Sequence, residues 1–124
     1  MTQVVADEGV LAMWSSILAG HLDLRLFAND VRPNRGSTRA DFVEPKLAGY
    51  APILLLSTEW ELTPESAAYP EQEFTFVGVG EDIYGYFVLK GPTLYWAERF
   101  SDGPYSTRRV GDRVFVTVRQ EWRR

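Results

Sequence analysis

Residues 83–100, IYGYFVLKGPTLYWAERF, decide the fold, because two apolar runs flank Gly91 and Pro92. Glycine accepts a positive φ and proline fixes a negative one, so this pair favours a two-residue turn between antiparallel strands. Counting outward from the turn places Glu98 opposite Gly85. Both faces of the hairpin are largely apolar or aromatic. In a sheet with one face exposed to solvent, apolar and polar residues would alternate along each strand. We therefore expect a second sheet to cover one face, and a helix or another protein chain to cover the other.

The same register predicts a buried Glu98. Gly85 opposite it leaves room for the side chain, and Trp96 lies on the same face. A buried carboxylate needs a hydrogen-bonding partner. Because Arg99 points to the opposite face, we expect a more distant arginine, such as Arg25, or a pair of backbone amides to supply it.

The rest of the chain combines a single helix with short strands. Apolar residues recur at helical spacing over residues 7–20, and Gly20 favours a left-handed stop. The apolar face of this predicted helix carries Val10, Leu11, Trp14, Ile17 and Leu18. From residue 22 the period changes to two, which indicates strands.

The order of these segments predicts the fold class. We expect strands at residues 22–27, 53–56 (a buried one), 59–62, 73–79 and 114–118, and polar loops at residues 29–40 and 64–71. Strands and helices do not alternate, so a parallel α/β fold is not expected. The sequence predicts an all-β fold, an antiparallel β-sandwich or jelly-roll-like barrel of seven or eight strands with one N-terminal helix. Residues 1–124 form one domain in this interpretation, and residues 1–20 form its N-terminal arm and helix.

The composition excludes several classes of site. The 124 residues include no cysteine, which excludes disulfides, thiolate metal sites and cysteine nucleophiles. His21 is the one histidine, so a metal site built on several histidines is also excluded. We interpret it as a residue at the helix end or on the surface. The chain has no apolar run of the roughly 18–20 residues that a membrane span needs, so we expect no membrane association.

Residues of the kinds used in catalysis are present without the spacing that catalysis needs. Ser15 and Ser16 lack the flanking glycines of a nucleophile elbow. Gly78 and Gly80 lead into a strand instead of the helix that follows a phosphate-binding loop, so we interpret them as a turn. We predict a protein that is not an enzyme and has no cofactor.

Acidic side chains are plentiful, and an oxygen-ligated cation is the metal site that they could form. Glu81 with Asp82, and Asp41 with Glu44, are the pairs that could contribute ligands. No EF-hand spacing occurs, and nothing singles out two of the 17 acids as a catalytic pair. We therefore predict no metal site.

Charge is distributed unevenly along the chain. Residues 1–98 carry 6 basic and 14 acidic side chains (net −8), and residues 99–124 carry 7 basic and 3 acidic ones (net +4). The C-terminal arginines interleave with a strand pattern and form no clustered cationic surface, so we expect no direct binding of nucleic acid. A basic edge that meets an acidic neighbour fits this distribution better.

The polar loop at residues 29–40 is a candidate for such an edge. It contains Arg32, Arg35 and Arg39, and no acidic residue follows Asp30 within it. We expect these arginines to contact an acidic surface on another protein chain.

Aromatic residues are numerous: four tryptophans, six tyrosines and seven phenylalanines. Exposed tryptophan and tyrosine could form a sugar-binding platform, but the alternating placement favours a core with a subunit interface. Tyr84, Tyr86 and Tyr95 lie on the second face of the hairpin, and we predict that they contact another chain. We expect a homo-oligomer, with a trimer as the first hypothesis.

Several ordered blocks carry a family resemblance: LRLFANDVRP (residues 24–33), TRADFVE (38–44), GYAP (49–52), YGYFV (84–88) and WAERF (96–100). Over about residues 22–120 the chain resembles small structural proteins of tailed-bacteriophage virions. The resemblance implies a non-enzymatic virion protein, most simply a capsid-decoration (cement) protein or another minor head or tail component. Its implied partners are other virion proteins, such as major capsid or tail subunits, and no catalytic residues are implied.

A second interpretation stays open. The chain could be a carbohydrate- or receptor-binding module of a phage fibre or tail, with Trp60, Trp96 or Tyr69 as platforms. The cement interpretation is favoured because the sequence offers apolar faces, a divided charge and arm-like segments at residues 1–6 and 29–40.

Overall fold

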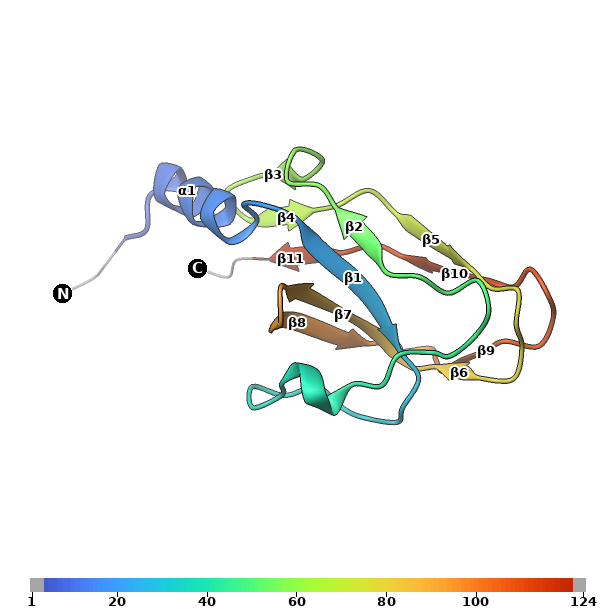
Figure 1. Cartoon of the computed structure of the whole chain (residues 1–124). Coiled ribbons are helices and arrows are strands. Elements are labelled where there is room, and N and C mark those ends of the chain that lie inside the picture. The colour runs from blue at the N-terminus through green and yellow to red at the C-terminus, as the bar shows by residue number, and fades with distance from the viewer. Residues whose placement is uncertain (1–3, 122–124) are drawn as a thin grey trace.

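A computed structural model describes residues 4–121 and shows a mostly β protein (Figure 1). One α-helix, α1 (Asp7–Ile17), precedes eleven strands of this part of the chain, and every strand pair is antiparallel. The strands are β1 (Leu22–Phe27), β2 (Ile53–Leu55), β3 (Glu61–Leu62), β4 (Ser66–Ala68), β5 (Gln72–Thr75), β6 (Asp82–Ile83), β7 (Gly85–Lys90), β8 (Thr93–Arg99), β9 (Tyr105–Ser106), β10 (Arg113–Val116) and β11 (Arg119–Glu121). The predicted all-β fold with one N-terminal helix is confirmed. The strands outnumber the predicted seven or eight because several contain only two or three residues.

The strands form one large sheet and three small ones. The large sheet has the order β2-β1-β7-β8, with β8 at one edge. The small sheets are β10-β5, β11-β4-β3 and β6-β9. In Figure 1 the β4, β11, β5 and β10 strands form the layer beside β1 and β7.

The main core lies between these layers. Leu22, Leu24 and Leu26 of β1 are fully buried on the inner face of the large sheet. They belong to one apolar cluster with residues of the small sheets, among them Phe74 and Val116. Helix α1 contributes Val10, Trp14 and Leu18 to the same cluster. This alternation places one side of β1 in the core, as the period of two predicts.

The outer face of the large sheet is also apolar, and the chain covers it with its own loop. Phe27 and Phe87 lie on this face and are fully buried. Phe42 stacks on Phe87 with ring centroids 5.0 Å apart, and its centroid also lies 5.0 Å from that of Phe27. We call residues 28–46, which include Phe42, the outer loop. The cover that we expected from a helix or another protein chain is therefore supplied by this loop.

The hairpin contains a β-bulge that the sequence analysis did not foresee. Gly91 has a φ of 56°, as the predicted turn requires, and Leu89 pairs with Leu94. The register then shifts, and Val88 pairs with Trp96. The extra residue moves every later partner by one position.

The prediction of a buried Glu98 is therefore wrong. Glu98 lies opposite Tyr86 and is exposed, while Gly85 pairs with Arg99. The space above Gly85 is filled by the ring of Phe27, its partner on β1.

Three smaller predictions also need correction. Helix α1 ends at Ile17, three residues before Gly20, and Ile17 is 42% exposed. The apolar run at residues 53–56 forms an edge strand, with Leu54 half exposed, and is not fully buried. The predicted polar loop at residues 64–71 contains β4, whose Ala67 is fully buried.

Candidate functional site

The outer loop is held against the sheet where its two ends meet. The Asn29 side chain donates from Nδ2 to the carbonyl of Asp41 (2.8 Å) and accepts at Oδ1 from the Val43 amide (2.9 Å). The Ala28 amide donates to the Val43 carbonyl at 2.7 Å. Asparagine suits this position because one side chain both donates to and accepts from the backbone.

Local hydrogen bonds also shape the interior of the loop. The Asn34 amide donates to Ser37 Oγ at 2.9 Å, and Asn34 Oδ1 accepts from the Gly36 amide at 2.8 Å. Thr38 and Asp41 form a capping box around the short 3-10 helix Arg39–Asp41. Such side-chain to backbone bonds define a turn without regular secondary structure.

Arg99 connects the loop to the edge strand β8. Its guanidinium donates to the Asp30 carboxylate at 2.5 Å and to the Val31 carbonyl at 3.3 Å. The same guanidinium lies 5.0 Å from the centre of the Tyr84 ring. The entry of the loop is thereby fixed beside β8.

Glu44 anchors the other end of the loop. Arg25 of β1 donates to its Oε2 at 2.9 Å, and the Tyr50 hydroxyl donates to its Oε1 at 2.6 Å. Arg39 lies 3.5 Å from the same Oε2. Of the arginines in the outer loop, Arg39 is therefore already paired within the chain.

This network shifts the pKa values of two of its members. Burial of the Tyr50 hydroxyl raises its pKa well above the ordinary value, and the bond to the Glu44 carboxylate raises it further. Burial of Arg25 lowers its pKa, but Glu44 and Asp23 outweigh that effect and the net shift is upward. Arg25 is thus held as a cation and Tyr50 as a neutral donor, so the network is structural in character.

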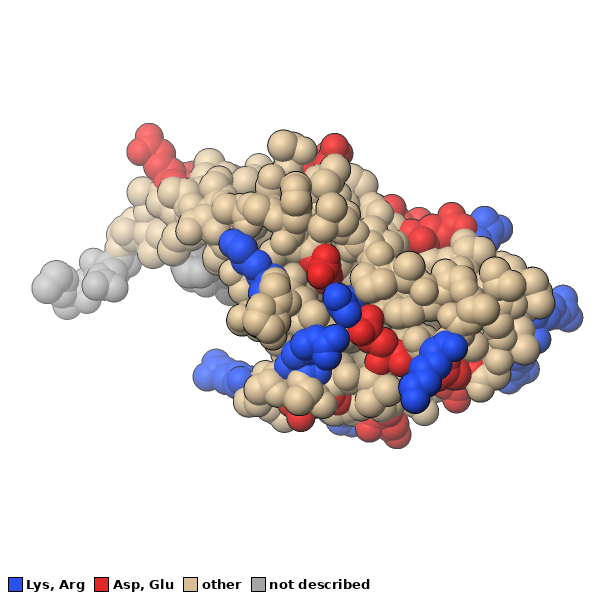
Figure 2. All heavy atoms as spheres, in the orientation of Figure 1, with Lys and Arg blue, Asp and Glu red and all other residues tan. Residues whose placement is uncertain are grey.

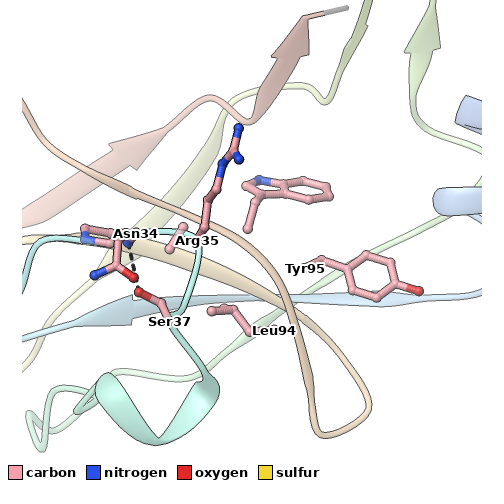
Figure 3. A pocket seen from close by; sticks show the side chains of 8 residues that line it. Asn34, Arg35, Ser37, Leu94 and Tyr95 are labelled. Atoms are coloured by element: carbon pink, nitrogen blue, oxygen red, sulfur yellow. Dashed lines mark hydrogen bonds between the residues drawn. The ribbon is translucent and has the colours of Figure 1, made fainter.

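An open hollow of about 330 Å³ separates the outer loop from β8 (Figure 3). The loop side is formed by Pro33, Asn34, Arg35 and Ser37, and the strand side by residues 94–97. Arg35 and Trp96 both line the hollow, and Figure 3 shows the extended Arg35 side chain at its loop side. Tyr95, the bulge residue, is 37% exposed at the hollow. We call this site the first hollow.

A second hollow of about 590 Å³ adjoins β8 as well. It is lined by Glu98, Thr117, Arg119 and Glu121. The two hollows share β8, and no strand within residues 4–121 pairs with the free side of β8. The edge strand therefore offers unpaired backbone groups with open space around them.

The predicted contact residues differ in their exposure and in their contacts within the chain. Arg32 and Arg35 are exposed and form no ion pair in the described part of the chain. Tyr95 lines the first hollow with Arg35, whereas Tyr84 is half-buried beneath Arg99. Tyr86 lies in the core with 2% exposure, so its ring is not accessible to a partner in this conformation. Its hydroxyl donates to Glu98 at 3.5 Å.

The tryptophan and tyrosine platforms considered for sugars are mostly inaccessible. Trp60 and Tyr69 are 9% and 6% exposed and pack edge to face with centroids 5.0 Å apart. Of the three predicted platforms, Trp96 alone lines the first hollow.

The candidate cation ligands are engaged by the chain itself. Glu81 accepts from the Lys46 amide at 2.7 Å, and Asp82 accepts from Ser106 Oγ at 2.7 Å. Across residues 4–121 no three histidine or acidic side chains gather as a metal site would require. Gly80 adopts a φ of 106° in the turn that leads to β6, and no helix follows it.

Sequence reasoning missed that β8 is an edge strand, because sheet order depends on contacts between distant segments. The local signal for the loop side was present in Asn34, Gly36 and Ser37, which are turn-forming residues. Nothing in their spacing shows that this turn lies beside β8.

The comparisons with known proteins identify no relative. No family model, curated protein or solved structure matches this chain. No helix among the described residues is long and apolar enough to cross a membrane.

Proposed function

We propose that this protein is a non-enzymatic structural component of a tailed-bacteriophage virion that binds neighbouring virion chains. A capsid-decoration (cement) protein is the first form of this proposal, and another minor head or tail component is the second. The observation that carries it is the open edge of β8, where Arg35, Tyr95 and Trp96 meet beside unpaired backbone.

Physical properties of this surface favour protein binding. Arginine, tyrosine and tryptophan are enriched at protein interfaces because they combine a large contact area with hydrogen-bonding groups. The outer loop is fixed by Asn29, Asp30 and Glu44, so little order has to be gained on binding. Figure 2 shows basic side chains across the lower front of the molecule, where the outer loop lies, with acidic ones among them.

The assignment to a virion rests on the resemblance of the sequence blocks at residues 24–52 and 84–100. It is tested by quantitative mass spectrometry of purified phage particles that carry this gene. We expect the chain in the particles at a fixed ratio to the major capsid or tail subunit. Its absence from purified particles would overturn the proposal.

The role of the loop arginines is tested by charge reversal. Replacing Arg32 and Arg35, the two loop arginines with no ion pair among the described residues, with glutamate should weaken incorporation and its dependence on salt; Arg39 is left unchanged because it pairs with Glu44. The matched control reverses Arg108 and Arg109, which are exposed and lie outside the outer loop. Equal incorporation of both variants would count against the arginine surface.

Self-association as a trimer stays a prediction. The apolar hairpin face that suggested it is covered by the outer loop, through Phe42. Light scattering at a protein concentration of tens of micromolar tests the oligomeric state directly. A monomer is compatible with a decoration protein that binds only to other virion chains.

A carbohydrate- or receptor-binding module is the second candidate function. Tyr95 and Trp96 line the first hollow together with Asn34 and Ser37, a combination of aromatic and polar groups that suits a sugar. Retention on a glycan array, lost in a Trp96→Ala variant, would favour this candidate over the first.

A further inference from the structure

The backbone of β8 alternates between bonded and free positions. The Phe100 amide donates to the Tyr84 carbonyl at 2.9 Å, which fixes the phase of the β7–β8 ladder. With a period of two, the backbone groups of Glu98 and Trp96 face β7. Those of Ala97 and Arg99 point away from the sheet, toward the free edge.

Space for a further strand exists along this edge. The first hollow reaches residues 94–97, and the second hollow reaches Glu98. Successive side chains of a strand point to opposite faces, so an added segment with a period of two would present one kind of side chain to each face of the sheet. Ala97, at the middle of the open edge, has only a methyl group and does not shield its own backbone.

Among the described residues, the outer loop presents positively charged arginines without ion-pair partners beside this edge. Arg35 lines the first hollow. Arg32, three residues earlier in the sequence, is also exposed. Both lack an ion pair within residues 4–121, whereas Arg99 is paired with Asp30. In the second hollow, Arg119 is already paired with Glu121.

Glu98 in the second hollow adds a second constraint. It is exposed and faces the second hollow, where a further carboxylate would be repelled. The complementary segment therefore carries acidic side chains toward Arg35 and uncharged ones toward Glu98.

We propose that the open edge of β8 binds an extended, acidic segment of a partner chain as an additional strand. The backbone of Ala97 and Arg99 forms the new ladder, and Arg35 pairs with the carboxylates of the segment. This inference rests on the proposed function and specifies the chemistry of the partner.

The probe is a seven-residue peptide in which glutamate alternates with threonine, titrated into the full chain and followed by nuclear magnetic resonance. We expect the amide hydrogens of Ala97 and Arg99 to exchange about tenfold more slowly when the peptide is bound. Affinity should fall as salt is added. A peptide with lysine in place of glutamate is the matched control, and it should not bind.

Two variants locate the binding. Ala97→Pro removes the outward N–H and leaves the β7–β8 ladder intact, so it should abolish peptide binding. Arg35→Glu, at an exposed position that the fold does not need, should weaken binding by about tenfold or more. Arg108→Glu is the control for the charge change and should bind as the parent does.

The proposal is overturned by unchanged exchange at Ala97 and Arg99, by equal binding of the peptide to Ala97→Pro, or by equal binding of the lysine peptide to the parent chain. Exchange that slows with protein concentration in the absence of peptide also overturns it, because the occupant is then a second copy of this chain.

The failure of this inference differs from the failure of the proposed function. If the parent chain is present in particles and Ala97→Pro is incorporated equally well, the function stands and the edge is not the docking site. If the parent chain is absent from particles, the virion role fails, and the peptide titration still decides the chemistry of the edge.

Discussion

Arg99 of β8 and Asp30 of the outer loop lie 69 residues apart in the chain and form a 2.5 Å hydrogen-bonded ion pair. This pair, with the bond from Arg99 to the Val31 carbonyl, places the loop beside the edge strand and so creates the first hollow. Asp30 is 71% exposed, so the contribution of the pair to the stability of the fold is small. Its role is to position the loop.

Asp30→Ala tests this role. We expect the free energy of unfolding to fall by less than about 1 kcal/mol, because exposed pairs contribute little. Binding of the acidic peptide should weaken several-fold, because the loop side of the hollow is no longer fixed. Glu73→Ala is the control: it removes the exposed Arg113 pair away from the loop and should leave peptide binding unchanged. Unaltered binding by Asp30→Ala would mean that the pair does not shape the site.

Gly85→Ala should be strongly destabilising. A Cβ at Gly85 would collide with the carbonyl oxygen of Glu98 and lie 2.5 Å from Cζ of Phe27. Both neighbours are held by the sheet, so we expect a loss of about 3 kcal/mol or more in the free energy of unfolding. Urea denaturation measures this loss.

Gly9→Ala provides the matched control for this substitution. Gly9 lies in α1, and a Cβ there meets only Val5 Cγ1 at 3.9 Å. Alanine should stabilise the helix by about 0.5–1 kcal/mol. Opposite signs for the two variants are expected, and a loss of less than about 1 kcal/mol at Gly85 would contradict the packing described for Phe27.

Phe42→Ala should uncover the outer face of the large sheet. Phe42 is 5% exposed and stacks on Phe87, so its loss should cost about 3 kcal/mol. The exposed Phe27 and Phe87 should also bind a hydrophobic dye and promote self-association. Val43→Ala, at a neighbouring residue that is 50% exposed, should change neither property by a measurable amount. A Phe42→Ala variant that self-associates no more than the parent and does not bind the dye would show that the loop is not the cover.

The raised pKa values of two buried tyrosines lead us to expect that the protein becomes less stable at alkaline pH. Burial raises the pKa of Tyr50 and of Tyr86 well above 10, and the nearby Glu44 and Glu98 carboxylates add to the shift. Above pH 10 the unfolded chain therefore releases protons that the folded protein keeps. The free energy of unfolding should fall with increasing pH, by up to about 1.4 kcal/mol per pH unit for each tyrosine.

Denaturation with urea between pH 9 and about pH 11.5 measures this dependence. Tyr86→Phe should make the slope smaller, because one of the groups with a raised pKa is removed. Tyr86 is the better choice for this test, since the bond from its hydroxyl to Glu98 is long, at 3.5 Å. Equal slopes in the parent and the variant would contradict the assigned burial effect.

Local patterns predicted the elements that carry their own signal. The alternation of Leu22, Leu24 and Leu26 indicated β1, and Gly91 with Pro92 indicated the hairpin turn, whose positive φ is confirmed. The apolar spacing around Trp14 indicated α1, although the helix ends earlier than Gly20. These features depend on a few neighbouring residues and are visible without tertiary contacts.

The errors arose where tertiary contacts decide the structure. Ser66 and Ala67 have little strand propensity, and β4 forms because it pairs with β3 and β11. The bulge at Tyr95 cannot be read from a turn-based count, and it carried Glu98 from a predicted buried position to an exposed one. The sequence likewise contained no signal that Phe42 folds back onto Phe87.

The proposal that β8 binds another virion chain is tested most directly by photo-crosslinking within purified particles. A photoreactive phenylalanine analogue replaces Tyr95, the exposed aromatic residue of the first hollow, and as a control replaces Phe115, which is 50% exposed on β10. We expect the probe at position 95 to link to an acidic extended segment of another virion protein, and the probe at position 115 to form no such link. Particles in which position 115 forms the link and position 95 does not would contradict this proposal.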